Sequence, residues 1–230
     1  MFRNIKKNLF FSRFNLLFQK GINDGRISEF DDEIFDKMSN TYIACLPVSM
    51  RIKHSNHMFA QGTCYERSLY MFLALDDAYL VRGDDKVLEY KYGKGHEGHG
   101  WVEVGDVVYD PSLMLKFDKD TYYNLYGITN TKKCDKKTYL EQHSDFVEQH
   151  VSHDINDFRP GGKRRLELGL LIIQLRCLSE MLGDCEFTTD LNNYLESISY
   201  DEKQICDERN KVIQKILRDE QAMARISGNA

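Results

Sequence analysis

The sequence has few of the features that mark several common classes of protein. It contains only 3 prolines among 230 residues, which excludes long polyproline linkers. Its 6 cysteines are too sparse for a small disulfide scaffold, and no CxxC pair indicates a zinc knuckle or a thioredoxin-type site. No apolar run is long enough to span a bilayer, so we expect no integral membrane segment. A net charge of −5 leaves no excess of basic residues for general nucleic-acid binding.

The N-terminus combines positive charge with apolar residues, as a signal peptide does. Arg13 interrupts the apolar run, however, and no small-residue cleavage site follows Leu17 and Phe18. We therefore expect an amphipathic first helix. Attachment to a membrane surface stays open, because Lys and Arg alternate there with Phe and Leu. Scattered free thiols are typical of a reducing compartment, which predicts a cytoplasmic protein; delivery into a host cell stays open as well.

The composition and the residue pattern of the sequence indicate one globular domain of class α+β with helical additions. A chain that is 42% hydrophobic and 29% charged has the composition of an ordinary folded protein. We expect an N-terminal helical segment over residues 1–59, a central core over 60–158 and a C-terminal helical subdomain over 159–230.

Helix and turn signals refine this organisation. Two helices are expected before residue 40, separated by a break at Gly21–Gly25, with Ser28 as the cap of the second helix. From Gln61 to Ile128 the pattern indicates a helix, two hairpins and a short helix that ends before Gly127. Further helices are predicted over residues 136–151, 164–182 and 190–226, the last with a break near residue 199.

Cys64 occupies a position that favours a reactive thiol. Thr63 and Glu66 fit a capping box, and Leu69 and Phe72 follow at helical spacing, so Cys64 is predicted to be the first residue of a helix. The unpaired N–H groups and the helix dipole stabilise a thiolate there and lower the pKa of the thiol. The competing interpretation is a small buried hydrophobic residue, which is the usual role of a lone cysteine.

A predicted hairpin brings a histidine and a carboxylate together. Two runs rich in valine and aromatic residues flank a Gly-Asp turn, and in that register Val104 faces Val107 while Trp101 faces Asp110. Strand alternation then places His99 and Asp110 on one face as diagonal neighbours, within reach of a hydrogen bond. Such a carboxylate orients a catalytic histidine. The competing interpretation is an exposed strand histidine, with Asp110 merely ending the strand.

The order of these residues resembles the core of the transglutaminase-like superfamily of papain-related thiol enzymes. The spacings of 35 and 11 residues between Cys64, His99 and Asp110 suit that compact core better than the papain-like peptidases proper. Small bacterial peptidases of this superfamily, including leader-peptide peptidases, are the most similar branch, and arylamine acetyltransferases share the order. The resemblance covers roughly residues 60–115, about a quarter of the chain. The matching segments are Gly62-Thr63-Cys64-Tyr65, His99-Gly100-Trp101-Val102-Glu103-Val104 and Tyr109-Asp110-Pro111-Ser112.

The resemblance implies a fold and a mechanism. In the fold, the helix that carries Cys64 packs on an antiparallel sheet that carries His99 and Asp110. In the mechanism, Cys64 forms a thioester with an amide carbonyl, and water or an amine resolves it. Gln61 resembles the glutamine that supports the oxyanion, although it lies closer to the cysteine than usual, and the N–H of Cys64 is an equally good donor. With Trp101, Gln61 is predicted to contact the substrate.

These features favour a cysteine peptidase or deamidase acting on a protein or peptide, with no cofactor and no metal. A transglutaminase or acyltransferase with the same triad, or an inactive binding protein on this fold, stays open.

GxGxxG at residues 93–98 is not a dinucleotide site because a strand, not a helix, follows it; a lid loop is expected instead. An apolar stripe in the last helix indicates core packing or a protein partner. Its members are Ile205, Val212, Ile213, Ile216 and Leu217.

Overall fold

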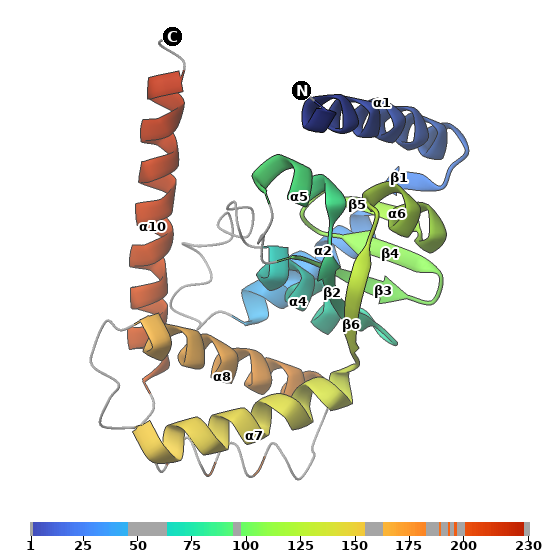
Figure 1. The fold of residues 1–230 in the computed structure, drawn as a ribbon. Coiled ribbons are helices and arrows are strands. Elements are labelled where there is room, and N and C mark those ends of the chain that lie inside the picture. The colour runs from blue at the N-terminus through green and yellow to red at the C-terminus, as the bar shows by residue number, and fades with distance from the viewer. Residues whose placement is uncertain are drawn as a thin grey trace. The chain divides into compact units, whose positions relative to one another are not determined.

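The computed structural model describes residues 2–45, 64–93, 98–154, 163–182 and 201–227, together with residues 189, 193 and 196 (Figure 1). Contacts within the chain divide it into two compact units. The first unit comprises Met1–Ser39 and Gln61–Lys136, and the second comprises Asn40–Ala60 and Lys137–Ala230. Each unit thus combines two separate stretches of chain, whereas the three segments expected from the sequence follow one another along it.

The first unit is built on a six-stranded sheet in the order β1-β5-β4-β3-β2-β6. Every neighbouring pair of strands is antiparallel, and helices accompany the sheet, which confirms the expected α+β class. The strands are β1 Ile27–Glu29, β2 Tyr79–Asp84, β3 His99–Val104, β4 Val107–Asp110, β5 Leu115–Asp118 and β6 Thr129–Cys134.

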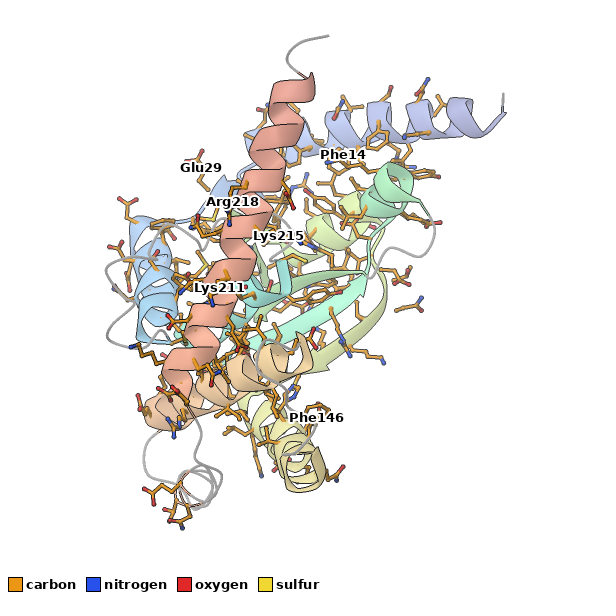
Figure 2. The ribbon with its side chains drawn as sticks, turned by 90° about the vertical axis from the view of Figure 1, so that its left-hand side faces the viewer. Phe14, Glu29, Phe146, Lys211, Lys215 and Arg218 are labelled. Carbon is orange, nitrogen blue, oxygen red and sulfur yellow. The ribbon has the colours of Figure 1, made fainter. Side chains whose placement is uncertain are left out.

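One face of this sheet carries the main apolar core. Alternate residues of five strands point to this face, because side chains in a strand alternate between its two sides. Helices α1 (Phe2–Asn23), α5 (Lys86–Tyr92) and α6 (Lys119–Tyr126) supply the apolar side chains that cover it. Phe14, labelled in Figure 2, joins α1 to this core, since its ring centroid lies 5.3 Å from that of Tyr126. The buried strand and helix residues of the cluster are Ile27, Val81, Trp101, Val108, Phe117, Tyr122, Leu125 and Tyr126.

Helix α4 (Cys64–Ala74) packs on the opposite face of the sheet, against β3 and β2. A Cβ atom at Gly100 would lie 2.8 Å from Cδ1 of Tyr65, so the first turn of α4 stands almost directly on the backbone of β3. Gly100 and Trp101 are adjacent and therefore point to opposite faces. The close approach of α4 depends on the absence of a side chain at position 100.

Local structure in this unit departs from the sequence prediction at three places. Ser28 does not cap a helix: it lies in β1 and pairs with Lys116, and α2 (Asp32–Ala44) begins three residues after β1 ends. Helix α5 was not expected; Asp85 caps it by accepting hydrogen bonds from two backbone N–H groups. Strand β6 was also missed, because its sequence TNTKKC has no apolar alternation. The short helix α6 ends at Tyr126 before a left-handed Gly127, as predicted.

The second unit is helical in the described residues. Its long helices are α7 (Lys136–Asp154), which begins at the unit boundary, α8 (Lys163–Leu182) and α10 (Glu202–Ser227). The first two agree with the predicted ranges, and α10 occupies the later part of the third. Gly169 lets α8 and α10 approach closely, because a Cβ atom there would overlap the side chain of Ile205.

Candidate active site

The nucleophile predicted from the sequence lies at a helix start. Helix α4 begins at Cys64, which is half-buried and carries a free thiol. The first-turn N–H groups of α4 are therefore close to the sulfur, and the backbone N–H groups of Tyr65 and Gly100 both donate hydrogen bonds to it. Thr63 and Gln61 lie outside the described residues, so the capping role of the first and the oxyanion role of the second stay predictions.

The hairpin that carries the predicted base and carboxylate has the expected register. Val104 pairs with Val107, and Val102 pairs with Tyr109. The same register, extended by one residue, sets Trp101 opposite Asp110. His99 and Asp110 then share a face, and His99 Nε2 lies 2.8 Å from Asp110 Oδ2. Both side chains are buried.

Asp110 is held by hydrogen bonds on both of its oxygen atoms. Besides His99, the hydroxyl of Tyr122 donates to Oδ2 at 2.9 Å. The backbone N–H groups of Ser112 and Leu113 donate to Oδ1 at 2.9 and 3.3 Å. Four donors fix the orientation of the carboxylate. The imidazole is consequently oriented by a carboxylate that cannot readily turn away.

Tyr122 was missed in the sequence analysis. It lies on α6 and is fully buried, and its ring packs 5.4 Å from Trp101 and 5.0 Å from Phe117. Burial raises the pKa of its phenol well above the usual value, and the charge of Asp110 raises it further. The hydroxyl therefore stays protonated and remains a hydrogen-bond donor to the carboxylate. A Tyr in the short helix after the hairpin was the only signal in the sequence, and it did not reveal this contact.

The three side chains shift one another's pKa values in the direction that a thiol nucleophile needs. Burial lowers the pKa of His99, but the charge and hydrogen bond of Asp110 outweigh it, and the pKa rises from 6.5 to about 10. Burial raises the pKa of Cys64, but the hydrogen bond and charge of His99 outweigh it, and the pKa falls below 9.0. The arrangement therefore favours a thiolate beside an imidazolium.

A buried arginine also lies in the electrostatic field of this site. Arg67 follows Cys64 by one turn of α4 and is only 9% exposed. Burial lowers the pKa of its guanidinium, whereas the charges of Cys64 and Asp110 raise it. Its positive charge therefore favours the ionised form of the Cys64 thiol. In the sequence, only the position of Arg67, three residues after Cys64, pointed to this electrostatic role.

The buried side chain of Trp101 packs beside the imidazole of His99. Its side chain is fully buried, its ring centroid is 6.1 Å from that of His99, and its indole N–H donates to Glu103 at 3.2 Å. A substrate cannot touch a side chain in that position, so Trp101 does not fit the substrate contact expected from the sequence. It fixes one side of the imidazole by packing.

Glu103 is the centre of a buried polar cluster that holds Trp101. Its carboxylate is 1% exposed and accepts a hydrogen bond from Tyr123 at 2.6 Å. It forms ion pairs with Lys119 at 2.6 Å and with Lys133. Burial raises the pKa of Glu103, but the two lysines and Tyr123 outweigh it, and the pKa is lowered. The charge is thus compensated, as a buried carboxylate requires.

Gly98 lies directly before β3, the strand that carries His99. Gly98 has a positive φ of 85°, and a Cβ atom there would lie 2.9 Å from the carbonyl oxygen of Gly83. The chain can therefore enter β3 beside β2 only with glycine at this position. Residues 94–97 of the expected lid loop lie outside the described residues.

Among the described residues, no group of three or more His, Cys, Asp or Glu side chains is placed to hold a metal ion. In the same part of the chain, no helix is long and apolar enough to cross a membrane. No family model, no curated protein and no solved structure matches the chain, so the resemblance to the transglutaminase-like superfamily stays a prediction from its motifs.

Proposed function

We propose that the protein is a thiol hydrolase that cleaves an amide bond in a protein or peptide, as a cysteine peptidase or deamidase, with Cys64, His99 and Asp110 as its catalytic triad. The observation that carries this proposal is the hydrogen-bonded chain from the half-buried thiol through His99 to Asp110. A helix-start cysteine, a buried histidine and a fully bonded carboxylate rarely meet for packing alone, because burying charged groups is costly.

The chemistry begins with the charged pair. The thiolate of Cys64 attacks the amide carbonyl carbon, and N–H groups at the start of α4 stabilise the oxyanion. The imidazolium of His99 then donates its proton to the leaving nitrogen, so the C–N bond breaks and a thioester remains. His99 next takes a proton from water, whose oxygen attacks the thioester. The acid product leaves, and the thiolate of Cys64 beside the imidazolium of His99 is restored.

The position of each nitrogen of His99 supports these roles. Nε2 is engaged by Asp110, which leaves Nδ1 for the thiol. Asp110 holds the ring in that orientation and stabilises its positive charge, while Tyr122 and the two backbone donors keep the carboxylate in place.

The packing of α4 on an antiparallel sheet is the feature that supports the papain-related core implied by the sequence resemblance. In both, a cysteine begins a helix, and the histidine and aspartate come from neighbouring strands of the sheet that the helix covers. This likeness supports the proposed chemistry and says nothing about the substrate.

The test measures iodoacetamide labelling of Cys64 as a function of pH, with mass spectrometry to assign the site. In the parent protein, Cys64 should label well below pH 8, because its thiolate is already populated. In His99→Ala, the labelling profile should move to that of an ordinary thiol, whose pKa is about 8.5, or higher because of burial. If Cys64 labels like an ordinary thiol in the parent, the proposal fails.

Cys134 is the internal control in the same digest. It is also half-exposed, but burial and the charge of Asp135 raise the pKa of its thiol. Its labelling should rise only at alkaline pH and should not change in His99→Ala. A second measurement follows the thioester formed with an activated ester, and compares its loss in water with its loss in the presence of an amine. Faster loss to the amine, with an amide product, would assign the protein to the acyltransferases instead.

A further inference from the structure

Helix α1 differs in charge from the rest of the chain. The whole chain has a net charge of −5, yet residues 2–23 contain no Asp or Glu. Five basic residues lie in this helix, namely Arg3, Lys6, Lys7, Arg13 and Lys20. Helix α1 therefore carries only positive side-chain charges, whereas the rest of the chain has a net negative charge.

The two faces of α1 have different surroundings. One face packs on the core of the first unit: Phe14 contacts Tyr126, and Phe18 stacks on Phe14 with 5.9 Å between the ring centroids. The opposite face carries leucines that are exposed to solvent, since Leu9 is 67% and Leu16 is 72% exposed. The side chains of these two leucines therefore contribute little to the core of this unit and are available to a partner.

The exposed leucines alternate with basic residues along one stripe. Leu9, Arg13, Leu16 and Lys20 follow one another at intervals of four, three and four residues, which places all four on the same side of a helix. We call these four residues the outer face of α1. On such a face the leucines can enter the acyl boundary of a membrane, while the long side chains of Arg13 and Lys20 extend their charges up to the headgroups.

We propose that the outer face of α1 binds an anionic lipid surface, with Leu9 and Leu16 entering the acyl boundary and Arg13 and Lys20 pairing with the headgroups. The core-facing aromatic side keeps α1 attached to the sheet, so the helix does not need to leave the protein in order to bind. The folded first unit would thereby be held at the membrane surface.

Other occupants fit this face less well. A second copy of the chain would bring two helices together that both carry only positive charges, which repel one another. A nucleic acid would neutralise the cations but would leave the exposed leucines without an apolar partner. A membrane surface satisfies both kinds of side chain at once, because it offers negative headgroups above hydrocarbon.

The experiment is sedimentation of the full-length protein with vesicles at about 0.15 M salt. Vesicles with about 30% phosphatidylserine in phosphatidylcholine should bind the parent, and vesicles of phosphatidylcholine alone should bind it at least about fivefold less, since each cation near an anionic surface contributes about that factor. Leu16→Glu should lower the partition coefficient on anionic vesicles by about tenfold or more, because a leucine side chain leaves the acyl boundary and a negative charge replaces it.

Asn15→Glu is the matched control. It introduces the same side chain at the neighbouring exposed position, which points away from the outer face. This variant should retain at least about half of the parent's partition coefficient. Both substitutions replace exposed side chains, so the thermal unfolding midpoint of each variant should equal that of the parent.

Three results would overturn the proposal. The first is no binding of the parent to anionic vesicles. The second is an equal loss of binding in Leu16→Glu and Asn15→Glu, which would make the interaction a matter of net charge alone. The third is tighter binding to an RNA duplex than to the vesicles, with loss in Arg13→Glu but not in Leu16→Glu, which would identify the outer face as a polyanion site. None of these results bears on the pH profile of Cys64.

Discussion

Replacing Asp110 with asparagine is the sharpest test of how this site works, because the two side chains have the same shape. The asparagine oxygen can still accept the backbone hydrogen bonds from Ser112 and Leu113. Its amide nitrogen must then face the atoms that now donate to Oδ2, which are His99 Nε2 and the hydroxyl of Tyr122. The hydroxyl can rotate to accept, but His99 must lose the proton on Nε2. The neutral ring then carries its proton on Nδ1, toward Cys64, and cannot act as the base.

The size of the effect follows from the pKa values. The rise in the pKa of His99 from 6.5 to about 10 corresponds to roughly 5 kcal/mol of preference for the charged ring. Without the carboxylate, burial lowers this pKa and only the interaction with Cys64 opposes it, so we expect His99 to be neutral at pH 7. Cys64 then loses its charged partner, so burial is opposed only by the two backbone hydrogen bonds and the pKa of its thiol rises. An ordinary thiol of pKa about 8.5 is only about 3% ionised at pH 7, so labelling at that pH should fall by roughly tenfold or more. Amide turnover should fall by about 10³- to 10⁴-fold, since the tautomer is also wrong.

The same change should alter the pH dependence of stability. A pKa that is raised in the folded state stabilises the fold fully below pH 6.5, and this contribution is lost as the pH rises through about 10. We expect the free energy of unfolding in a Cys64→Ala background, which removes the titration of the thiol, to fall across that range. Adding Asp110→Asn should flatten the slope.

The control for this prediction is Asp106→Asn, the same substitution at an exposed position in the turn of the same hairpin. It should leave both the labelling profile and the slope of stability with pH unchanged. If Asp110→Asn labels at Cys64 with the parent's pH profile, Asp110 does not orient His99 and the reasoning is wrong.

Two further substitutions examine the supports of the site. Gly100→Ala would place a methyl group 2.8 Å from the ring of Tyr65, so we expect α4 to shift and the pH of Cys64 labelling to rise toward that of an ordinary thiol while the fold persists by circular dichroism. An unchanged labelling profile would mean that the close approach of α4 is unimportant. Glu103→Gln leaves Lys119 without its buried partner and should lower the free energy of unfolding by about 2 kcal/mol at pH 7. Because the pKa of Glu103 is lowered in the fold, the difference from the parent should shrink as the pH falls below 4.5; a constant difference would contradict this account.

The parts of the site that the sequence predicted are those fixed by local rules. The start of α4 at Cys64 follows from the apolar spacing of the helix and from Glu66 in its first turn. The pairing of Val104 with Val107 follows from a two-residue turn, and strand alternation then carries the register to His99 and Asp110. Each inference needs only a few neighbouring residues.

The parts that the sequence did not predict depend on contacts between distant residues. Tyr122 reaches Asp110 only because α6 crosses the sheet at that strand. Ser28 has the residue type of a helix cap, yet pairing with β5 makes it a strand residue. Strand β6 has a polar sequence, and its pairing with β2 alone makes it a strand. In each case tertiary contacts override the local preference.

For the proposed activity, the hairpin of β3 and β4 has a consequence for the order in which the site is assembled during folding. His99 and Asp110 are 11 residues apart and can meet as soon as one tight turn forms, whereas Cys64 is 35 residues from His99 and must wait for α4 to dock on the sheet. Until then Cys64 is an ordinary thiol of pKa about 8.5. In the proposed enzyme, a nascent or damaged chain therefore carries no activated nucleophile. A thiolate at Cys64 shows that the first unit has folded.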